Sequence, residues 1–397
     1  MTGPSSPLAR HWTLDPIVDF LNHGSFGACP RPVIEAQQRL RDEMERQPME
    51  FLLRRLPERL DAARNALAAF VGADPQNLAF VSNATSGVNA VLRSLPLRPG
   101  DELLVTDHEY NACKNALHFV AERAGATVVV ARVPFPLGSA QEVVDAVLGA
   151  AGDHTRLALI DHVTSLTGLV LPIAEIVRRL ADRGIDVLVD GAHAPGMLEL
   201  SLDALGAAYY TGNCHKWLCA PKGAALLYVR PDRQDRVRPL CISHGANTRR
   251  PGRSLFQDEF DWVGTVDPTA WLCVPVAIEA MASIVPGGWD EVRRRNRVLA
   301  LQARDILCAG LGIPPPCPDE MIGSLCAVPL PDGPGAAPAS ALHLDPLQQA
   351  LLSEHRIEVP VVPWPAPPRR LIRISAQLYN DRAQYQRLAA ALGRLPR

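Results

Sequence analysis

The stretch "TGNCHKWLCAPKG", residues 211–223, holds two of the only three lysines in the chain, which are Lys114, Lys216 and Lys222, although Lys and Arg together number 40. Arginine is used wherever any positive charge would serve, so a retained lysine indicates a position where guanidinium cannot substitute. A desolvated lysine amine loses its proton readily and can condense with a carbonyl. Lys216 is therefore a candidate Schiff-base lysine; the alternative is three surface lysines without a chemical role.

A carboxylate lies at the end of an apolar run in "IDVLVDGAHAPG", residues 185–196, where Asp190 is followed three positions later by His193. A bare carboxylate buried at a strand end costs several kcal/mol, so it needs a cation or hydrogen-bond donors. A protonated pyridinium nitrogen is one suitable partner. Metal ligation and helix capping are the alternatives for Asp190.

An anion site is indicated by "VSNATSGVNAVLRSL", residues 81–95, a strand that leads through Asn83, Ala84, Thr85 and Ser86 into a helix. The first-turn amides of a helix lack partners and its dipole favours negative charge, so a phosphate would fit there. The alternative is that Thr85 or Ser86 merely caps the helix.

The three features together point to one cofactor. Along the chain come the anion-binding turn, the strand-end Asp190 and then Lys216, 26 residues further on. Pyridoxal 5′-phosphate (PLP) needs an anchor for its phosphate, a carboxylate that keeps its ring nitrogen protonated and an amine that holds C4′ as an imine. The combination is much more specific than any one feature.

The surrounding pattern predicts an α/β fold that would bring these residues together. Between about 55 and 230, seven short apolar runs read as strands buried on both faces, and they lie at 77–82, 101–107, 127–133, 156–163, 185–190, 207–212 and 224–229. Segments with helical spacing, such as 141–151 and 173–184, separate some of them. The alternation predicts a mostly parallel sheet covered by helices, with ligands outside the carboxyl ends of its strands.

After about residue 266 the pattern changes to that of a smaller α+β domain. Two long helical segments, 268–284 and 289–312, precede strand-like runs at 323–330, 356–362 and 370–375 and a closing helix. We therefore predict an N-terminal segment, 1–30, that lines the cleft, a large cofactor-binding domain, 31–265, and a small C-terminal domain, 266–397.

Composition excludes several other classes of protein. The 397 residues are 47% apolar with a net charge of −2, which is typical of a globular chain and gives no basic field for nucleic acid. No stretch has the roughly 20 apolar residues of a membrane span, and the first residues lack a signal-peptide core, so a cytoplasmic protein is expected. Nine scattered cysteines without a C-x-x-C pair indicate reduced thiols and no metal site.

The motifs resemble a known family. "NATSGVN", "DGAHAPG" and "GNCHKW", with "FLNHGSFGACP" and "VTDHEYNA", are similar to the class V aminotransferase group of fold-type I PLP enzymes, in the branch of isopenicillin N epimerase and its C–S lyase relatives. The similarity covers most of the chain. It implies a fold-type I large domain with a smaller α+β C-terminal domain, bound PLP and an obligate homodimer.

The resemblance also implies roles for individual residues. Lys216 would hold the cofactor as a Schiff base and Asp190 would pair with its ring nitrogen, while His193 and Ser165 would lie near its phenolic oxygen and Tyr110 would stack on the ring. The phosphate would be bound by Thr85, Ser86, Asn213 and His215, completed by Thr265 from the partner chain. Arg373 would grip the substrate α-carboxylate, and Asn22 and His23 would line the cleft.

These residues do not select a single reaction. Cysteine desulfurases of this class carry a nucleophilic cysteine shortly before the carboxylate arginine, but residues 357–373 contain none and Cys326 lies too far upstream. We expect either an epimerase, with Tyr110 or His23 as a candidate second acid, or a C–S lyase acting on a cysteine-derived L-amino acid. An aminotransferase or desulfurase-like enzyme is the alternative; an inactive PLP-fold binding protein is a minor one, disfavoured by the intact lysine.

Overall fold

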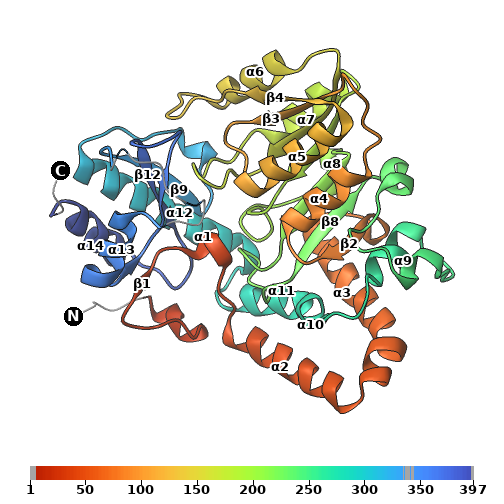
Figure 1. Ribbon diagram of the computed structural model, residues 1–397. Helices are drawn as coiled ribbons and strands as arrows, with labels where there is room; N and C mark the ends of the chain where they lie inside the picture. Colours follow the sequence, from red (N-terminus) through yellow and green to blue (C-terminus); the bar gives the residue numbers. More distant parts are fainter. Residues whose placement is uncertain (1–5, 334, 336–339, 341–343, 395–397) are drawn as a thin grey trace.

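A seven-stranded sheet forms the centre of the computed structural model, which describes residues 6–333, 335, 340 and 344–394 (Figure 1). The strand order is β2-β8-β7-β6-β5-β3-β4. The five strands from β7 to β4 are parallel, and β8 runs antiparallel to both β7 and β2. The strands are β2 (Leu78–Val81), β3 (Glu102–Thr106), β4 (Thr127–Ala131), β5 (Thr155–Asp161), β6 (Asp186–Asp190), β7 (Tyr209–Asn213) and β8 (Ala225–Val229). Each of the seven apolar runs is thus a strand, and the predicted mostly parallel α/β fold is confirmed.

Helices cover both faces of this sheet, because alternate strand residues point to opposite sides. Leu103, Leu159 and Leu188 pack against one set of helices, whereas Leu104 and Ile160 pack against another. The first face is covered by α4 (Ala84–Ser94) and α5 (Asn111–Ala124), and the second by α3 (Leu56–Val71), α6 (Ala140–Ala150) and α7 (Ile173–Ala181). The strands are therefore buried on both faces, as their apolar sequences predicted.

The start of α4 is fixed closely against the sheet. The side chain of Asn83 accepts a hydrogen bond from the Ser86 amide at 2.8 Å and so caps the helix. Gly87 then lies so close to β7 that a Cβ there would stand 2.2 Å from the Thr211 hydroxyl oxygen. Glycine thus allows the N-terminus of α4 to approach the end of β7.

A smaller antiparallel sheet in the order β11-β12-β9 follows in the C-terminal part. Its strands are β9 (Leu325–Leu330), β11 (Val361–Pro363) and β12 (Arg370–Ser375), and its helices are α12 (Gly288–Leu311), α13 (Pro346–His355) and α14 (Arg382–Leu392). The predicted run 356–362 is two strands rather than one, because β10 (Ile357–Glu358) pairs elsewhere. The predicted helix 268–284 is likewise divided into α10 (Thr269–Leu272) and α11 (Val274–Ser283), with Pro275 in the first turn of α11.

The N-terminal segment connects the two sheets. Its strand β1 (Asp19–Phe20) pairs in parallel with β10, and the Ser375 amide donates to the Leu21 carbonyl at 2.9 Å. The next element, α1 (His23–Phe26), lies between the two sheets, and α2 (Arg31–Arg46) follows it (Figure 1). Residues 1–5 of the predicted segment 1–30 lie outside the described residues, and the domain boundaries at 30 and 265 stay predictions.

The other short elements surround these layers. They are α8 (Leu202–Leu205), α9 (Leu255–Asp261), the 3-10 helices η1 (Pro7–His11), η3 (Pro75–Asn77), η4 (Pro231–Arg236), η5 (His244–Asn247) and η6 (Asp319–Met321), and the π-helical η2 (Glu50–Arg55). Within the described residues, no single helix is long and apolar enough to cross a membrane. The helices Thr269–Ser283 and Gly288–Leu311 reach the length and apolar composition of a membrane span only when taken together, and they are bent by 70° relative to each other.

Candidate active site

The predicted lysine and carboxylate come together at the carboxyl edge of the large sheet. Asp190 is the last residue of β6, and Lys216 lies on the turn that follows the neighbouring strand β7. This edge is where parallel α/β sheets bind ligands. His193, on the turn after β6, places its Nε2 atom 3.2 Å from the Lys216 amine.

The protonation state of this lysine follows from its neighbours. The indole N–H of Trp217 donates to Nδ1 of His193 at 3.3 Å, and an indole nitrogen can only donate. Burial, followed by the charge of Lys216, lowers the pKa of His193 well below its usual range, so the ring is neutral and carries its proton on Nε2. An Nε2–H group can only donate to Lys216, so this contact favours the neutral amine, which accepts with its lone pair.

The pKa of Lys216 is shifted in the same direction, towards the neutral amine. Burial lowers the pKa of the amine to about 8, with the positive charge of Arg373 as the second cause and the negative charge of Asp190 acting in the opposite direction. The amine is partly buried in the turn. The side chain is thus poised to act as a nucleophile or base near neutral pH.

Asp190 is a buried carboxylate without a cationic partner among the described ion pairs. Its Oδ1 accepts from the Ala192 amide at 2.9 Å and its Oδ2 from the thiol of Cys113 at 3.2 Å. Burial raises the pKa of this carboxyl group, and the two hydrogen bonds offset that effect in part. A cationic ligand group placed against Asp190 would lower the cost of its burial.

Three of the predicted phosphate residues, Thr85, Ser86 and Asn213, lie together at the start of α4. The side-chain oxygen of Asn213, at the end of β7, accepts from the Ala84 amide at 2.9 Å. Thr85 and Ser86 lie in the first turn, whose amides and positive dipole end favour an anion. His215 donates from Nδ1 to the Ala224 carbonyl at 2.9 Å, and burial lowers its pKa to about 4, so it stays neutral. The helix cap is Asn83 rather than Thr85 or Ser86.

Arg373 of β12 is brought to the same region from the small sheet. Its Nη1 donates to the Ser165 carbonyl at 2.6 Å and the Ser165 hydroxyl at 3.3 Å, and its Nη2 donates to the Ser25 hydroxyl at 2.7 Å. Its Nε is buried without a hydrogen-bond partner among the described residues. Burial lowers the pKa of the guanidinium to about 10. Ser165 thus fixes the arginine in this structure, in addition to the cofactor role that the resemblance implies.

Tyr110 lies beside the arginine. It stands at the N-terminal end of α5, with 44% of its surface exposed, and its hydroxyl is close enough to oppose the lowering of the Arg373 pKa. The side chain is therefore free to contact a cofactor or a substrate.

Asn22 and His23 are engaged with the protein itself. The side-chain nitrogen of Asn22 donates to Glu358 at 3.2 Å. His23 is fully buried, with Nδ1 2.8 Å from the Tyr379 hydroxyl and Nε2 3.0 Å from the Lys216 carbonyl. Burial lowers the pKa of His23 to about 3, so it stays neutral. This geometry suits a residue that supports the Lys216 turn better than one that binds substrate or supplies an acid.

Thr265 lies apart from these residues. It is exposed on the segment between α9 and α10, and the described contacts do not join it to the turn that carries Lys216. A role for Thr265 in cofactor binding would require the site of another copy of the chain.

Several neighbours of the site are absent from the sequence-based set. They are Ser25, Glu109, Cys113, Asp161, Trp217 and Tyr379. Asp161 ends β5 as Asp190 ends β6, but the apolar run predicted at 156–163 continued past it, so the sequence did not mark it as a strand end. Cys113 and Tyr379 carry no such signal, because only the packing of distant segments brings them to the site.

Comparison with known proteins agrees with this architecture. Residues 28–388 match the family model Aminotransferase class-V. The chain is 38% identical to isopenicillin N epimerase of Amycolatopsis lactamdurans, over 96% of both chains. It is 32% identical to the probable chloroplastic L-cysteine desulfhydrase of Arabidopsis thaliana, over 96% of this chain and 84% of that one.

A solved structure has the same fold at low sequence identity. The cystine C–S lyase C-DES, in complex with its reaction product cysteine persulfide, superimposes with a TM-score of 0.78 at 23% identity and covers 95% of this chain and 98% of its own. The family match spans nearly all of the described structure, and the relatives match over almost their full lengths. The chain therefore belongs to the class V aminotransferase family.

Proposed function

We propose that this protein is a PLP-dependent enzyme that acts at Cα or Cβ of an L-amino acid with a cysteine-derived side chain, as an epimerase or a C–S lyase. The observation that carries the proposal is the amine of Lys216, with its lowered pKa, which lies beside His193 and near Asp190 and Arg373 at one edge of the sheet. The names of the relatives, isopenicillin N epimerase and L-cysteine desulfhydrase, support both reactions.

The residues present fit PLP. Asp190 offers a buried carboxylate that lacks a cation, Lys216 offers an amine with a lowered pKa, and the first turn of α4 offers amides and the hydroxyls of Thr85 and Ser86 to a phosphate. When bound, PLP supplies an electron-accepting ring that stabilises negative charge formed at Cα. The role of the chain is to hold and orient that ring and, through Asp190, to keep its nitrogen protonated.

Arg373 would bind the substrate carboxylate through the edge that contains Nε. The two terminal nitrogens are already fixed by Ser165 and Ser25, while Nε has no partner. A carboxylate that meets Nε and the second hydrogen of Nη2 forms the bidentate pair that arginine favours. An α-amino acid would then be held with its Cα between Arg373 and Lys216.

Lys216 is the proposed base that removes the Cα proton. Its pKa of about 8 leaves a useful fraction neutral at physiological pH, and the Nε2–H of His193 stabilises that neutral form. Epimerisation needs a further acid on the opposite face of Cα, for which Tyr110 is exposed and available whereas His23 is occupied at both ring nitrogens. Loss of a β-sulfur group needs no second acid.

A proton NMR time course in D₂O tests the proposal and separates the two reactions. PLP-saturated enzyme is mixed with a panel of L-amino acids that includes cysteine S-conjugates, their sulfoxides and isopenicillin N. Loss of the Cα signal without new products would mean reversible deprotonation and favour an epimerase, whereas release of pyruvate would indicate C–S cleavage. A Lys216→Ala enzyme that matched the wild type in either assay would contradict the proposal.

A desulfurase or aminotransferase reaction is less well supported. Cys326 is buried in β9, opposite Ile374 of β12, and not on a loop that could carry sulfur. A transferase would form a keto acid from the amino substrate without pyruvate release from S-conjugates, which the same NMR experiment detects. Location in the cytoplasm stays a prediction from the sequence.

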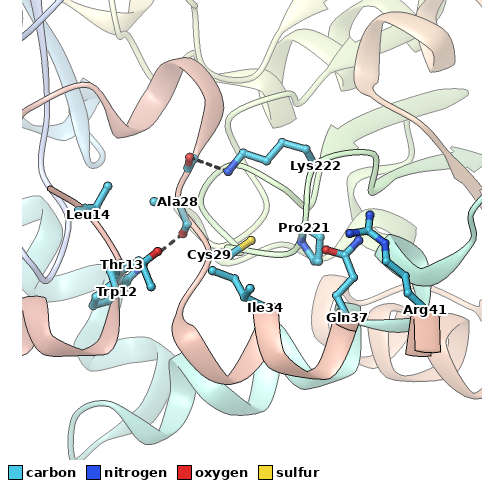
Figure 2. Close-up of a pocket in the computed structure, with 11 residues that line it drawn as sticks. Trp12, Thr13, Leu14, Ala28, Cys29, Ile34, Gln37, Arg41, Pro221 and Lys222 are labelled. Carbon is cyan, nitrogen blue, oxygen red and sulfur yellow. Dashed lines mark hydrogen bonds between the residues drawn. The ribbon is translucent and has the colours of Figure 1, made fainter. Parts of the chain in front are cut away.

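The active form is proposed to be a homodimer in which Thr265 completes the phosphate site of the partner. Next to it, Val266 is 44% exposed, and Asp267 pairs with Arg41 of α2. Arg41 and the exposed Ile34 line a pocket of about 390 Å³ between α2, the N-terminal segment and Pro221–Lys222 (Figure 2). This hollowed surface, which the Arg41–Asp267 pair joins to the segment of Thr265, is a suitable place for a second copy of the chain.

A hybrid enzyme would test that arrangement. Thr265→Ala and Lys216→Ala proteins are each expected to be impaired. If Thr265 acts across the interface, a mixed dimer contains one site with both native residues, so activity returns when the subunits are exchanged. No recovery in mixed dimers, verified by mass spectrometry, would mean that Thr265 does not serve the partner.

A further inference from the structure

Three buried carboxyl groups meet at the edge of the sheet beside the proposed cofactor site. Glu109 follows β3, Asp161 ends β5 and Asp190 ends β6, and all three are at most 2% exposed. Asp161 and Asp190 stand opposite each other in the register of the two parallel strands. Ligand atoms of Glu109, Asp190 and Cys113 lie within 4.8 Å of one another.

The hydrogen bonds of the three groups differ. Both oxygens of Asp190 accept a bond, from the Ala192 amide and the Cys113 thiol. Glu109 accepts one, from the Tyr110 amide to Oε1 at 3.1 Å, while its Oε2 and the Oδ2 of Asp161 are buried without a donor. A protonated carboxyl group can donate a hydrogen bond, whereas an ionised one can only accept, so burial without a donor disfavours the ionised form of both groups.

The surroundings supply little positive charge. Within the described residues, no ion pair joins any of the three carboxyl groups to a cation. Lys114 of α5, whose amine donates to the Asp107 carbonyl at 3.4 Å, and Lys216 act from a distance. The other titratable group in contact with them is the thiol of Cys113. The phenol of Tyr210, which burial keeps neutral by raising its pKa, packs on the opposite face of the sheet, where it is bonded to the neutral His162 at 2.9 Å.

Like charges this close in a buried site cannot all ionise. Burial, followed by the charges of Asp161 and Asp190, raises the pKa of Glu109 well above its usual range. Burial and then the charge of Asp190 raise the pKa of Asp161 in the same way. Asp190, with two donors, keeps the most favourable environment for a negative charge.

We propose that Glu109 and Asp161 are neutral carboxylic acids that confine the negative charge of the cluster to Asp190. They are positioning residues, because they act on the cofactor only through Asp190. The inference rests on the proposed function, in which Asp190 meets the ring nitrogen of PLP. It accounts for two buried acids beside a cofactor that needs only one carboxylate.

Infrared spectroscopy of the apoprotein tests the protonation directly. The carbonyl stretch of a protonated carboxylic acid is separate from the bands of carboxylates. We expect the wild-type protein at pH 7.5 to show this stretch, and Glu109→Gln and Asp161→Asn each to remove part of it. Both amides keep the shape of the neutral acid and can still hydrogen-bond to the remaining carboxyl. If neither variant changed the protonated-acid signal, the proposal would be overturned.

A matched control is available in Asp101. This carboxyl is also buried but forms an ion pair with Arg156 at 2.8 Å, which lowers its pKa. Asp101→Asn should therefore leave the protonated-acid band unchanged, and loss of the band in this variant would contradict the assignment. One equivalent of a divalent metal in the purified protein, bound through Glu109, would also overturn it.

A second measurement covers the charge on Asp190. In the PLP-loaded protein, Glu109→Gln should keep the wild-type visible spectrum and its pH dependence, whereas Asp190→Asn should change both. If Glu109→Gln changed the spectrum as Asp190→Asn does, the ionised carboxyl would be misassigned. Failure of the wild-type protein to bind PLP would refute the proposed function instead, and the infrared result on the apoprotein would still stand.

Discussion

At the scale of single residues, the indole of Trp217 determines which nitrogen of His193 carries the proton, and through it the charge of Lys216. Among the described residues, the indole of Trp217 alone donates to Nδ1 of His193, and Trp217→Phe removes this donor. His193 can then carry its proton on Nδ1 and accept at Nε2 from a protonated Lys216. We expect the pKa of Lys216 to rise by roughly one unit, the equivalent of one hydrogen bond of about 1–1.5 kcal/mol.

The rate at which the apoprotein is reconstituted with PLP reports this pKa, because only the neutral amine condenses with an aldehyde. The pH at which the rate reaches half its maximum should move upward in Trp217→Phe. Trp289→Phe is the matched control, since that indole donates to the Ile278 carbonyl. Equal pH profiles for Trp217→Phe and wild type would show that the indole does not fix the tautomer.

Arg373 should be sensitive even to a change that keeps its charge. Arg373→Lys loses the planar fork, and with it at least one charge-assisted hydrogen bond to the substrate carboxylate, worth about 1.5–3 kcal/mol. KM for the amino-acid substrate should therefore rise by roughly 10–150-fold while PLP absorbance is retained. Steady-state kinetics and, for comparison, the binding of an amine without a carboxylate test this. An equal loss of affinity for both ligands would place the carboxylate site elsewhere.

At the scale of elements, the segment that ends α1 supports the Lys216 turn by close packing. Gly27 has φ of +68°, and a Cβ there would stand 2.0 Å from the His215 carbonyl oxygen and 2.9 Å from Cα of Lys216. Lys222 fixes the same point by donating to the Gly27 carbonyl at 3.1 Å (Figure 2). Any side chain at position 27 must therefore displace the turn that carries the proposed catalytic amine.

Gly27 has φ of +68° and ψ of 169°, a region that is nearly restricted to glycine, so Gly27→Ala should lower the free energy of unfolding by about 1–3 kcal/mol before the clash is counted, and it should also weaken PLP binding. Gly206→Ala is the control for a positive φ without a clash, because Gly206 has φ of +73° and open space around the added methyl group. Urea unfolding and PLP titration of both variants give the comparison. A Gly27→Ala protein that bound PLP as tightly as Gly206→Ala would contradict the supporting role of this segment.

The large sheet was predictable because its strands are apolar runs that require burial on both faces. The C-terminal part was less predictable from the sequence. The helix α13 (Pro346–His355) has no distinct helical pattern of its own, and Pro360 divides one apolar run into two strands that belong to different sheets. Propensity and periodicity are local, whereas the pairing of β10 with β1 joins segments more than 300 residues apart.

The site shows the same contrast between local sequence patterns and long-range packing. Lys216 and Asp190 were identifiable because residue type and strand-end position together carry the chemistry. The hydrogen bonds of His23 to Tyr379 and to the Lys216 carbonyl could not be read from the sequence, because they depend on how α1 packs between the two sheets. The resemblance suggested a cleft residue at position 23; the geometry favours a buried support.

At the scale of the whole molecule, the buried neutral histidines make folding depend on pH. Burial lowers the pKa of His162 from 6.5 in the unfolded chain to about 4 in the folded protein. Burial lowers the pKa of His215 to about 4 in the same way. Between these pH values the unfolded chain binds more protons than the folded one. The stability that the neutral ring contributes is therefore complete above pH 6.5 and is lost as the pH falls toward 4.

We therefore expect the unfolding temperature of the apoprotein to decrease steeply below pH 6.5. His162→Asn removes one of these groups, so the proton uptake on unfolding at about pH 5 should decrease by close to one, seen as a shallower slope of stability against pH. His154 shows no such burial and serves as the control in His154→Asn. Parallel pH curves for wild type and His162→Asn would mean that His162 titrates alike in both states, and the acid sensitivity would then have to come from the other buried histidines.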